Sequence, residues 1–134
     1  MIQLDKIEPL EALGIEWLDQ TADQSRFRIG INGNHNDKGT FFAGSQYAAL
    51  VLAGWYHASQ WAQDQGLGDK VAIKEGTVRY PRAATSDLVV TARFQQLPDL
   101  RPSGHWRALV TSSAVNAEGE EVAHLVSDYR ILAT

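Results

Sequence analysis

The chain has 134 residues, 44% of them hydrophobic and 21% charged, and its formal net charge is −4. This balance excludes a disordered chain, and the absence of an 18-residue apolar run excludes a transmembrane helix. Cysteine is absent, which excludes disulfides, zinc–thiolate sites, iron–sulfur clusters and cysteine nucleophiles. Charged residues interrupt the first ten positions, so the chain lacks the apolar core of a signal peptide. We therefore expect one cytoplasmic domain, residues 1–134, with no membrane partner.

The charge is distributed unevenly. Residues 1–69 carry 4 basic and 9 acidic side chains, residues 70–107 carry 7 and 3, and residues 108–134 carry 1 and 4. The negative net charge of the whole chain argues against nucleic acid as a partner. The basic middle third fits either a patch for an anionic partner or ordinary solvated strand faces.

The first 40 residues predict a short helix, two strands and a polar loop. The expected ranges are 5–13 for the helix, started or interrupted at Pro9, then 15–18 and 27–31 for the strands and 32–40 for the loop.

A long helix is expected over residues 43–65. This segment contains no proline and only two glycines, and Gly66 and Gly68 follow it. Its first four turns are apolar around most of their circumference, so we expect the helix to be buried on several sides.

The second half predicts four strands in a row. The expected ranges are 71–80, with a bulge at Gly76, then 87–94, 106–115 and 122–132, with a loop at 97–104 and a hairpin turn at 117–120. The simplest packing is an α+β fold in which one curved antiparallel sheet wraps around the long central helix. Because one helix cannot cover the whole sheet, we expect a dimer that extends the sheet.

The loop and the start of the helix carry the pattern Asn34-x-Asn36-x-x-Gly39-Thr40-x-Phe42-x-Gly44-Ser45-x-Tyr47-Ala48, followed by Leu52-Ala53-Gly54-Trp55. This pattern resembles the hotdog-fold thioesterase family of the YiiD C-terminal-domain type. The resemblance implies a hotdog homodimer, with a tetramer left open, and a site shared between subunits. It also implies a substrate held on the phosphopantetheine of acyl carrier protein (ACP) or coenzyme A, with no further cofactor. Stand-alone members are similar to malonyl-ACP decarboxylases, which act at the initiation of fatty acid synthesis.

The residues offer little for hydrolysis. A hydrolytic enzyme needs a carboxylate that activates water or attacks the thioester. Two turns into the helix, where relatives carry one, this chain has Val51 and apolar neighbours, and at the loop positions that match an Asp-x-Asp-x-x-Gly pattern it has Asn34 and Asn36. Asp37 is the only acid left in the loop, and we interpret it as a solvated or turn-capping residue.

Decarboxylation of a malonyl thioester fits the neutral residues better, because it requires neither a nucleophile nor a general base. The first-turn N–H groups near Ala43, Gly44 and Ser45 lack intrahelical acceptors and can form an oxyanion hole. We predict that Gly44 lets the backbone approach the ligand, with packing against a strand as the alternative. We predict that the Asn34 amide donates to the thioester carbonyl or holds the carboxylate, with turn capping as the alternative.

Further candidates for substrate binding surround this loop. Asn36 either contacts the substrate or caps a turn. Thr40 and Ser45 either cap the helix or contact the substrate, and for Thr40 we favour capping. Arg79 and Arg82 flank Tyr80-Pro81 at a strand end, where they would suit an acidic ACP.

The sequence thus favours malonyl-ACP decarboxylation to acetyl-ACP over two alternatives. These are hydrolysis of an acyl-ACP or acyl-CoA thioester and a non-catalytic acyl-binding module. We interpret His35 and His57 as structural, and we expect no metal.

Overall fold

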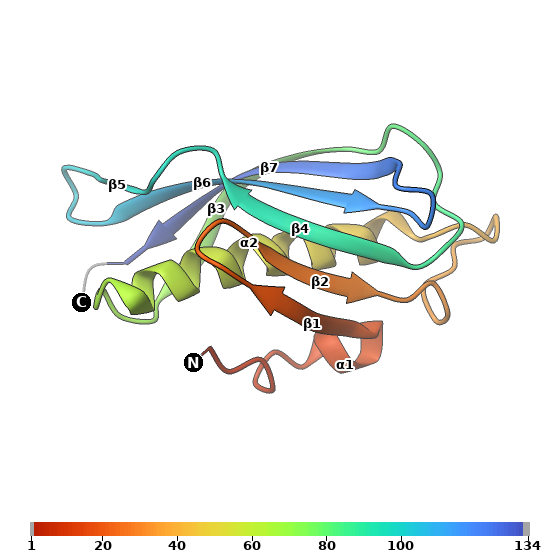
Figure 1. Ribbon diagram of the computed structural model, residues 1–134, viewed down its shortest axis with the longest axis horizontal. Coiled ribbons are helices and arrows are strands. Elements are labelled where there is room, and N and C mark those ends of the chain that lie inside the picture. The colour runs from red at the N-terminus through yellow and green to blue at the C-terminus, as the bar shows by residue number, and fades with distance from the viewer. Residues whose placement is uncertain (1, 133–134) are drawn as a thin grey trace.

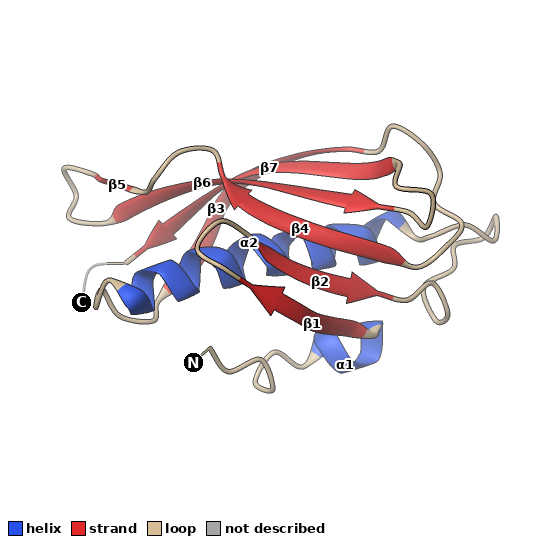
Figure 2. Ribbon diagram, viewed as in Figure 1, coloured by secondary structure: helices blue, strands red, loops and turns tan. Residues whose placement is uncertain are grey.

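One antiparallel sheet curves around a long helix in the computed structural model, which describes residues 2–132 (Figure 1). The elements are α1 (Pro9–Leu13), β1 (Ile15–Gln20), β2 (Ser25–Ile29), α2 (Ala43–Asp64), β3 (Val71–Arg79), β4 (Leu88–Phe94), β5 (Asp99–Leu100), β6 (Trp106–Val115) and β7 (Glu121–Ile131). The strand order is β1-β2-β4-β6-β7-β3, and β5 pairs with β6 outside this path. Figure 2 shows the strands as one layer with α2 along its inner face, which confirms the α+β prediction.

Helix α2 begins at Ala43, as predicted, and ends at Asp64, one residue before the predicted end. Gln65 forms its C-cap, and Gly66 follows with a φ of 71°, a left-handed conformation that favours glycine. Neither α2 nor any other helix within residues 2–132 is long and apolar enough to cross a membrane.

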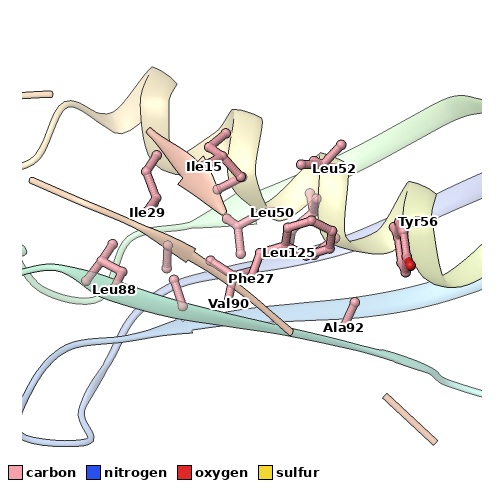
Figure 3. Packing of buried hydrophobic residues seen from close by; sticks show 14 of the residues in the cluster. Ile15, Phe27, Ile29, Leu50, Leu52, Tyr56, Leu88, Val90, Ala92 and Leu125 are labelled. Carbon is pink, nitrogen blue, oxygen red and sulfur yellow. The ribbon is translucent and has the colours of Figure 1, made fainter. Parts of the chain in front are cut away.

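The core lies between α2 and the inner face of the sheet (Figure 3). Alternate residues of the central strands point inward, and Phe27, Val90, Val110 and Leu125 are completely buried there. From the helix side, Leu50 is equally buried. Because burial of one such side chain contributes about 1.5–3 kcal/mol, this packing holds α2 firmly against the sheet and so determines where its N-terminus lies.

Strand β3 contains its bulge two positions before Gly76, the residue at which the sequence predicted it. The pairing of β3 with β7 shifts register between Ile73 and Glu75, whereas Gly76 pairs regularly with Ser127. The prediction of a bulge at Gly76 is therefore wrong. Glycine instead relieves close packing there, because a Cβ at position 76 would lie 3.0 Å from the hydroxyl oxygen of Tyr47.

The other predicted strands have shifted ends. Strand β2 begins and ends two residues earlier than predicted, and β1 extends to Gln20. The two-residue strand β5 lies within the predicted loop 97–104, where it pairs antiparallel with the start of β6. Both short extensions depend on pairing with a neighbouring strand, which a local hydrophobic pattern does not reveal.

One face of α2 remains uncovered by the sheet. Between the N-terminal segment and the edge strand β3, a groove of about 480 Å³ follows this face. We call it the α2 groove; it is lined by Ile7, Pro9, Leu10, Leu13, Ile15, Tyr47, Ala48, Val51, Leu52, Trp55, Ile73 and Tyr129. Its lining is almost entirely apolar, and β3 at its border is largely exposed along its length.

Candidate functional site

The first turn of α2 has no side-chain cap. Phe42 is the N-cap residue, and the first backbone bond of the helix runs from the Gln46 N–H to the Phe42 carbonyl at 3.2 Å. Within residues 2–132, the N–H groups of Ala43, Gly44 and Ser45 therefore have no backbone acceptor and no capping side chain. The prediction that Thr40 caps this helix is wrong. The free N–H groups carry the positive end of the helix dipole and suit an anion or a developing oxyanion.

Asn36 and Thr40 hold the preceding loop by bonding to each other. The Asn36 Oδ1 accepts the N–H groups of Lys38 at 2.9 Å and Thr40 at 3.0 Å. Its Nδ2 donates to the Thr40 hydroxyl at 2.8 Å. Asn36 thus caps a turn, which was one of its two predicted roles beside substrate contact.

Asn34 is a buried residue that ties three segments together. Its Nδ2 donates to the carbonyl of Leu13 and to that of Gly30, each at 2.8 Å. Its backbone carbonyl accepts the N–H of Phe42 at 2.7 Å. Because both amide hydrogens bond to backbone oxygens, no side-chain N–H of Asn34 is left for a substrate, contrary to the donor role that we predicted. The Oδ1 is buried without a partner among the described residues.

Gly44 packs against a side chain of its own helix start. A Cβ at this position would lie 2.6 Å from Cε2 of Phe42, so the aromatic ring occupies the space that the missing side chain leaves. The predicted alternatives were close approach of a ligand and packing against a strand. The observed neighbour is neither; Gly44 is an exposed residue, and its N–H has no acceptor within the described chain.

A cavity of about 240 Å³ opens beside the first turn of α2. We call it the helix-start cavity; it is lined by Asn36, Thr40, Phe41, Ala43, Gln46, Tyr80, Arg82, Ala83 and Ala84. It brings together four of the residues predicted from the sequence, which are Asn36, Thr40, Ala43 and Arg82. The other four, Asn34, Gly44, Ser45 and Arg79, do not line it.

Tyr80 and Gln46 are cavity residues that the sequence analysis did not select. The Tyr80 hydroxyl donates to the Ala43 carbonyl at 2.9 Å, and its pKa is raised by burial and by the nearby Tyr47, so it is a protonated donor at neutral pH. The Gln46 Nε2 donates to the Phe41 carbonyl at 3.1 Å, while its Oε1 is buried without a partner among the described residues. A polar amide directly after Ser45, at the start of a mostly apolar helix, was the signal that could have identified Gln46.

Arg82 is the one charged side chain that the described cavity wall contains. Its Nη1 bonds to Oε2 of Glu120 at 2.6 Å. Arg79 is exposed at the end of β3 and lies outside the wall. Asp37, the acid of the loop, is exposed and pairs with Lys38 at 2.9 Å.

The two histidines considered from the sequence do not line this cavity. His35 is exposed on the loop. His57 is only 2% exposed, and its Nδ1 lies 2.8 Å from the hydroxyl of Ser25. Burial lowers the pKa of His57 to about 4, so the ring is neutral at physiological pH. This placement agrees with a structural role for His57.

Several solved structures share this fold. A putative thioesterase from Shewanella oneidensis has a TM-score of 0.81 at 22% identity, with 94% of this chain and 88% of that chain covered. Thioesterase HI1161 of Haemophilus influenzae has a TM-score of 0.79 at 12% identity, with 99% and 92% covered. The PaaI protein of Escherichia coli, from the phenylacetic acid degradation operon, has a TM-score of 0.76 at 18% identity, with 94% and 86% covered.

At these identities the likeness establishes the fold alone, and that fold is the hotdog. No curated protein sequence matches the chain. A family model described as "Putative thioesterase (yiiD_Cterm)" matches residues 4–129. Because this match covers nearly the whole chain, the protein belongs to the YiiD C-terminal thioesterase family.

Proposed function

We propose that the protein decarboxylates a malonyl thioester, carried by ACP or coenzyme A, at the helix-start cavity. In this reaction the bond between Cα and the carboxylate carbon breaks and CO₂ leaves. The electron pair moves into the thioester to give an enolate. A proton from water then adds to Cα, which yields the acetyl thioester.

The observation that carries this proposal is the chemical inventory of the cavity. Its described lining contains no Asp, Glu or His. Hydrolysis needs a group that activates water or attacks the carbonyl, whereas decarboxylation needs only charge stabilisation and orientation. The wall offers neutral polar groups and the Arg82 guanidinium, which suit an anionic substrate.

The free N–H groups of α2 supply the stabilisation of the enolate in this proposal. Ala43 lines the cavity, and its N–H has no acceptor within the described chain. Charge develops on the thioester oxygen only as CO₂ leaves, so a donor at this oxygen lowers the barrier rather than merely tightening binding. One such donor contributes a factor of about 10²–10³ in rate. Asn34 acts indirectly: its amide holds the loop through the carbonyls of Leu13 and Gly30. The backbone carbonyl of the same residue accepts the N–H of Phe42.

Thioester hydrolysis is the second candidate, and the family description favours it. It would use Asp37 or a water molecule held in the loop. Asp37 does not line the cavity and already pairs with Lys38. A non-catalytic acyl-binding module is the third candidate, in which the same cavity binds a thioester without turnover.

A second copy of the chain fits the exposed edge of the sheet. Strand β3 has β7 as its single pairing partner in the described residues, so its other side is open. The apolar α2 groove lies beside this edge. Pairing through β3 would extend the sheet and cover the groove, which supports a homodimer. Exposed Arg79 at the same strand end suits an acidic carrier.

Mass spectrometry of ACP tests the proposal. The purified protein is incubated with malonyl-ACP, and the carrier is weighed over time. Acetyl-ACP is the expected product. Free ACP would instead support hydrolysis, and unchanged malonyl-ACP would support the binding module. Asp37→Asn is the matched variant, because decarboxylation predicts full activity and hydrolysis through Asp37 predicts its loss.

A further inference from the structure

Arg82 keeps much of its bonding capacity while it is held in place. The guanidinium has five N–H donors, and its one hydrogen bond within the described chain joins Nη1 to Glu120. Its Nε and Nη2 have no partner among those residues. The side chain is 51% exposed and lines the helix-start cavity, whereas Glu120 does not line it. The cation is therefore closer to the cavity than the carboxylate that pairs with it.

Glu120 is itself fixed by the β6–β7 turn. Its backbone N–H donates to Oδ1 of Asn116 at 2.8 Å, and its Oε1 accepts from Nδ2 of Asn116 at 3.1 Å. Ala117, which follows Asn116 in the turn, donates its N–H to the hydroxyl of Ser86 at 3.1 Å. Ser86 belongs to the same β3–β4 connection as Arg82. Two hydrogen bonds, Ala117 to Ser86 and Arg82 to Glu120, thus join the β6–β7 turn to the β3–β4 connection. They position the guanidinium at the wall of the helix-start cavity.

We propose that Arg82 binds the carboxylate of the acyl group and so determines selectivity for carboxylated thioesters. This inference rests on the proposed function, which places the acyl group in this cavity. An arginine presents two parallel N–H groups that match a carboxylate. The same cavity wall also contains Ala43 in the first turn of α2, so one wall offers a donor to the thioester oxygen and another to the carboxylate of a malonyl group.

This role has a specific kinetic consequence. As CO₂ leaves, negative charge moves from the carboxylate toward the thioester oxygen. Arg82 therefore interacts more strongly with the bound substrate than with the transition state, and it contributes to binding rather than to the chemical step. Removing it should raise KM and leave kcat unchanged or slightly increased.

The test uses pantetheine thioesters without a carrier protein, so that docking of ACP does not contribute. For Arg82→Ala we expect the KM for malonyl-pantetheine to rise about tenfold, which is the lower end for a charge-assisted hydrogen bond because the side chain is half-exposed. Arg82→Lys should recover part of this loss, since the charge remains but the paired donors do not. Arg26→Ala is the matched control, because Arg26 is also a half-exposed arginine paired with a carboxylate, Asp19, but it does not line the cavity.

Calorimetry separates this inference from the proposed function. The amide analogue of malonyl-pantetheine, a poorer electron sink, is titrated beside the uncharged butyryl analogue. Wild type should prefer the malonyl analogue, and Arg82→Ala should lose that preference without losing butyryl binding. An unchanged preference in Arg82→Ala, or a fall in kcat at constant KM, would overturn the role of Arg82 even if wild type releases CO₂. A lost preference without CO₂ release would instead leave Arg82 in place and refute the decarboxylase proposal.

Discussion

The ring of Tyr129 fills the space beside Gly54. A Cβ at position 54 would lie 2.5 Å from the Tyr129 hydroxyl oxygen and 2.9 Å from Cε2 of its ring. The same hydroxyl donates to the Val51 carbonyl at 2.6 Å, so β7 contacts the middle of α2 directly. The glycine therefore sets how closely the helix approaches the sheet.

Gly54→Ala should destabilise the protein by about 1–3 kcal/mol, because the tightly packed ring has to move. The better helix propensity of alanine, up to about 1 kcal/mol, offsets part of this cost. Gly44→Ala is the matched variant in the same helix, where the contacting Phe42 ring is 54% exposed and able to turn. Urea unfolding should show the larger loss for position 54. Equal losses would show that the ring of Tyr129 moves as freely as that of Phe42.

Ala43→Pro tests the oxyanion hole. Proline is well tolerated at the first position of a helix and removes one N–H. The preceding residue, Phe42, has φ −61° and ψ 129°, which is compatible with a following proline. We expect kcat for malonyl-ACP to fall about 10²–10³-fold with little change in melting temperature. Ala43→Val adds bulk but keeps the N–H, so it should retain most of the rate if the N–H is the active group.

Asn34→Asp should destabilise the fold before it affects chemistry. The substitution removes two N–H donors and places carboxylate oxygens against the carbonyls of Leu13 and Gly30. A loss of about 2–5 kcal/mol is expected, since buried acceptors then face each other. Thermal unfolding measures the loss. If Asn34→Asp melts like wild type, the buried amide does not bond as described, and a role at the substrate becomes open again.

His57 should make the protein less stable in mild acid. Its pKa is lowered to about 4, mainly by burial; the charge of Asp23 opposes this shift and that of Arg93 adds to it. In the unfolded chain the pKa is about 6.5. The unfolded state therefore binds more protons between these values, and stability falls as the pH falls from about 6.5 to 4. The full loss is about 3 kcal/mol. Urea unfolding at pH 7.5 and 4.5 should show a smaller difference for His57→Gln, while an identical pH dependence would assign the effect to other groups.

The dimer prediction is tested at the edge strand. At micromolar concentration, sedimentation should give about twice the chain mass of 14.8 kDa. Ile73 is 38% exposed and lines the α2 groove, so Ile73→Lys should shift the protein toward the monomer. Leu97→Lys is the control, because Leu97 is an exposed apolar residue outside β3 that does not line the groove. A wild-type monomer would exclude a site shared between subunits.

Much of the fold was readable because its signals are local. The start of α2 and its end near Gly66 follow from an apolar segment without proline. Strand β6 has the predicted bounds because its residues alternate cleanly between buried and half-buried. The bulge in β3 was misplaced because Gly76 serves contacts with Tyr47, which lies on a different element.

The candidate site was less predictable because its bonds cross long stretches of chain. One of the two acceptors of the Asn34 amide is the carbonyl of Leu13, 21 residues earlier. The carboxylate that holds Arg82 is that of Glu120, 38 residues later. A residue type in a loop indicates which groups are available, but only the folded chain shows which of them are already bonded.

The pairing of β3 with β7 also determines when the site can form during synthesis. Strand β3 ends at Arg79, yet its partner is complete only at Ile131. A ribosome adds the intervening residues over several seconds, during which β1, β2, α2 and β4 can already assemble while β3 has no partner. The connection that bears Arg82 therefore reaches its final position last, and until then both edges of β3 are exposed to other nascent chains.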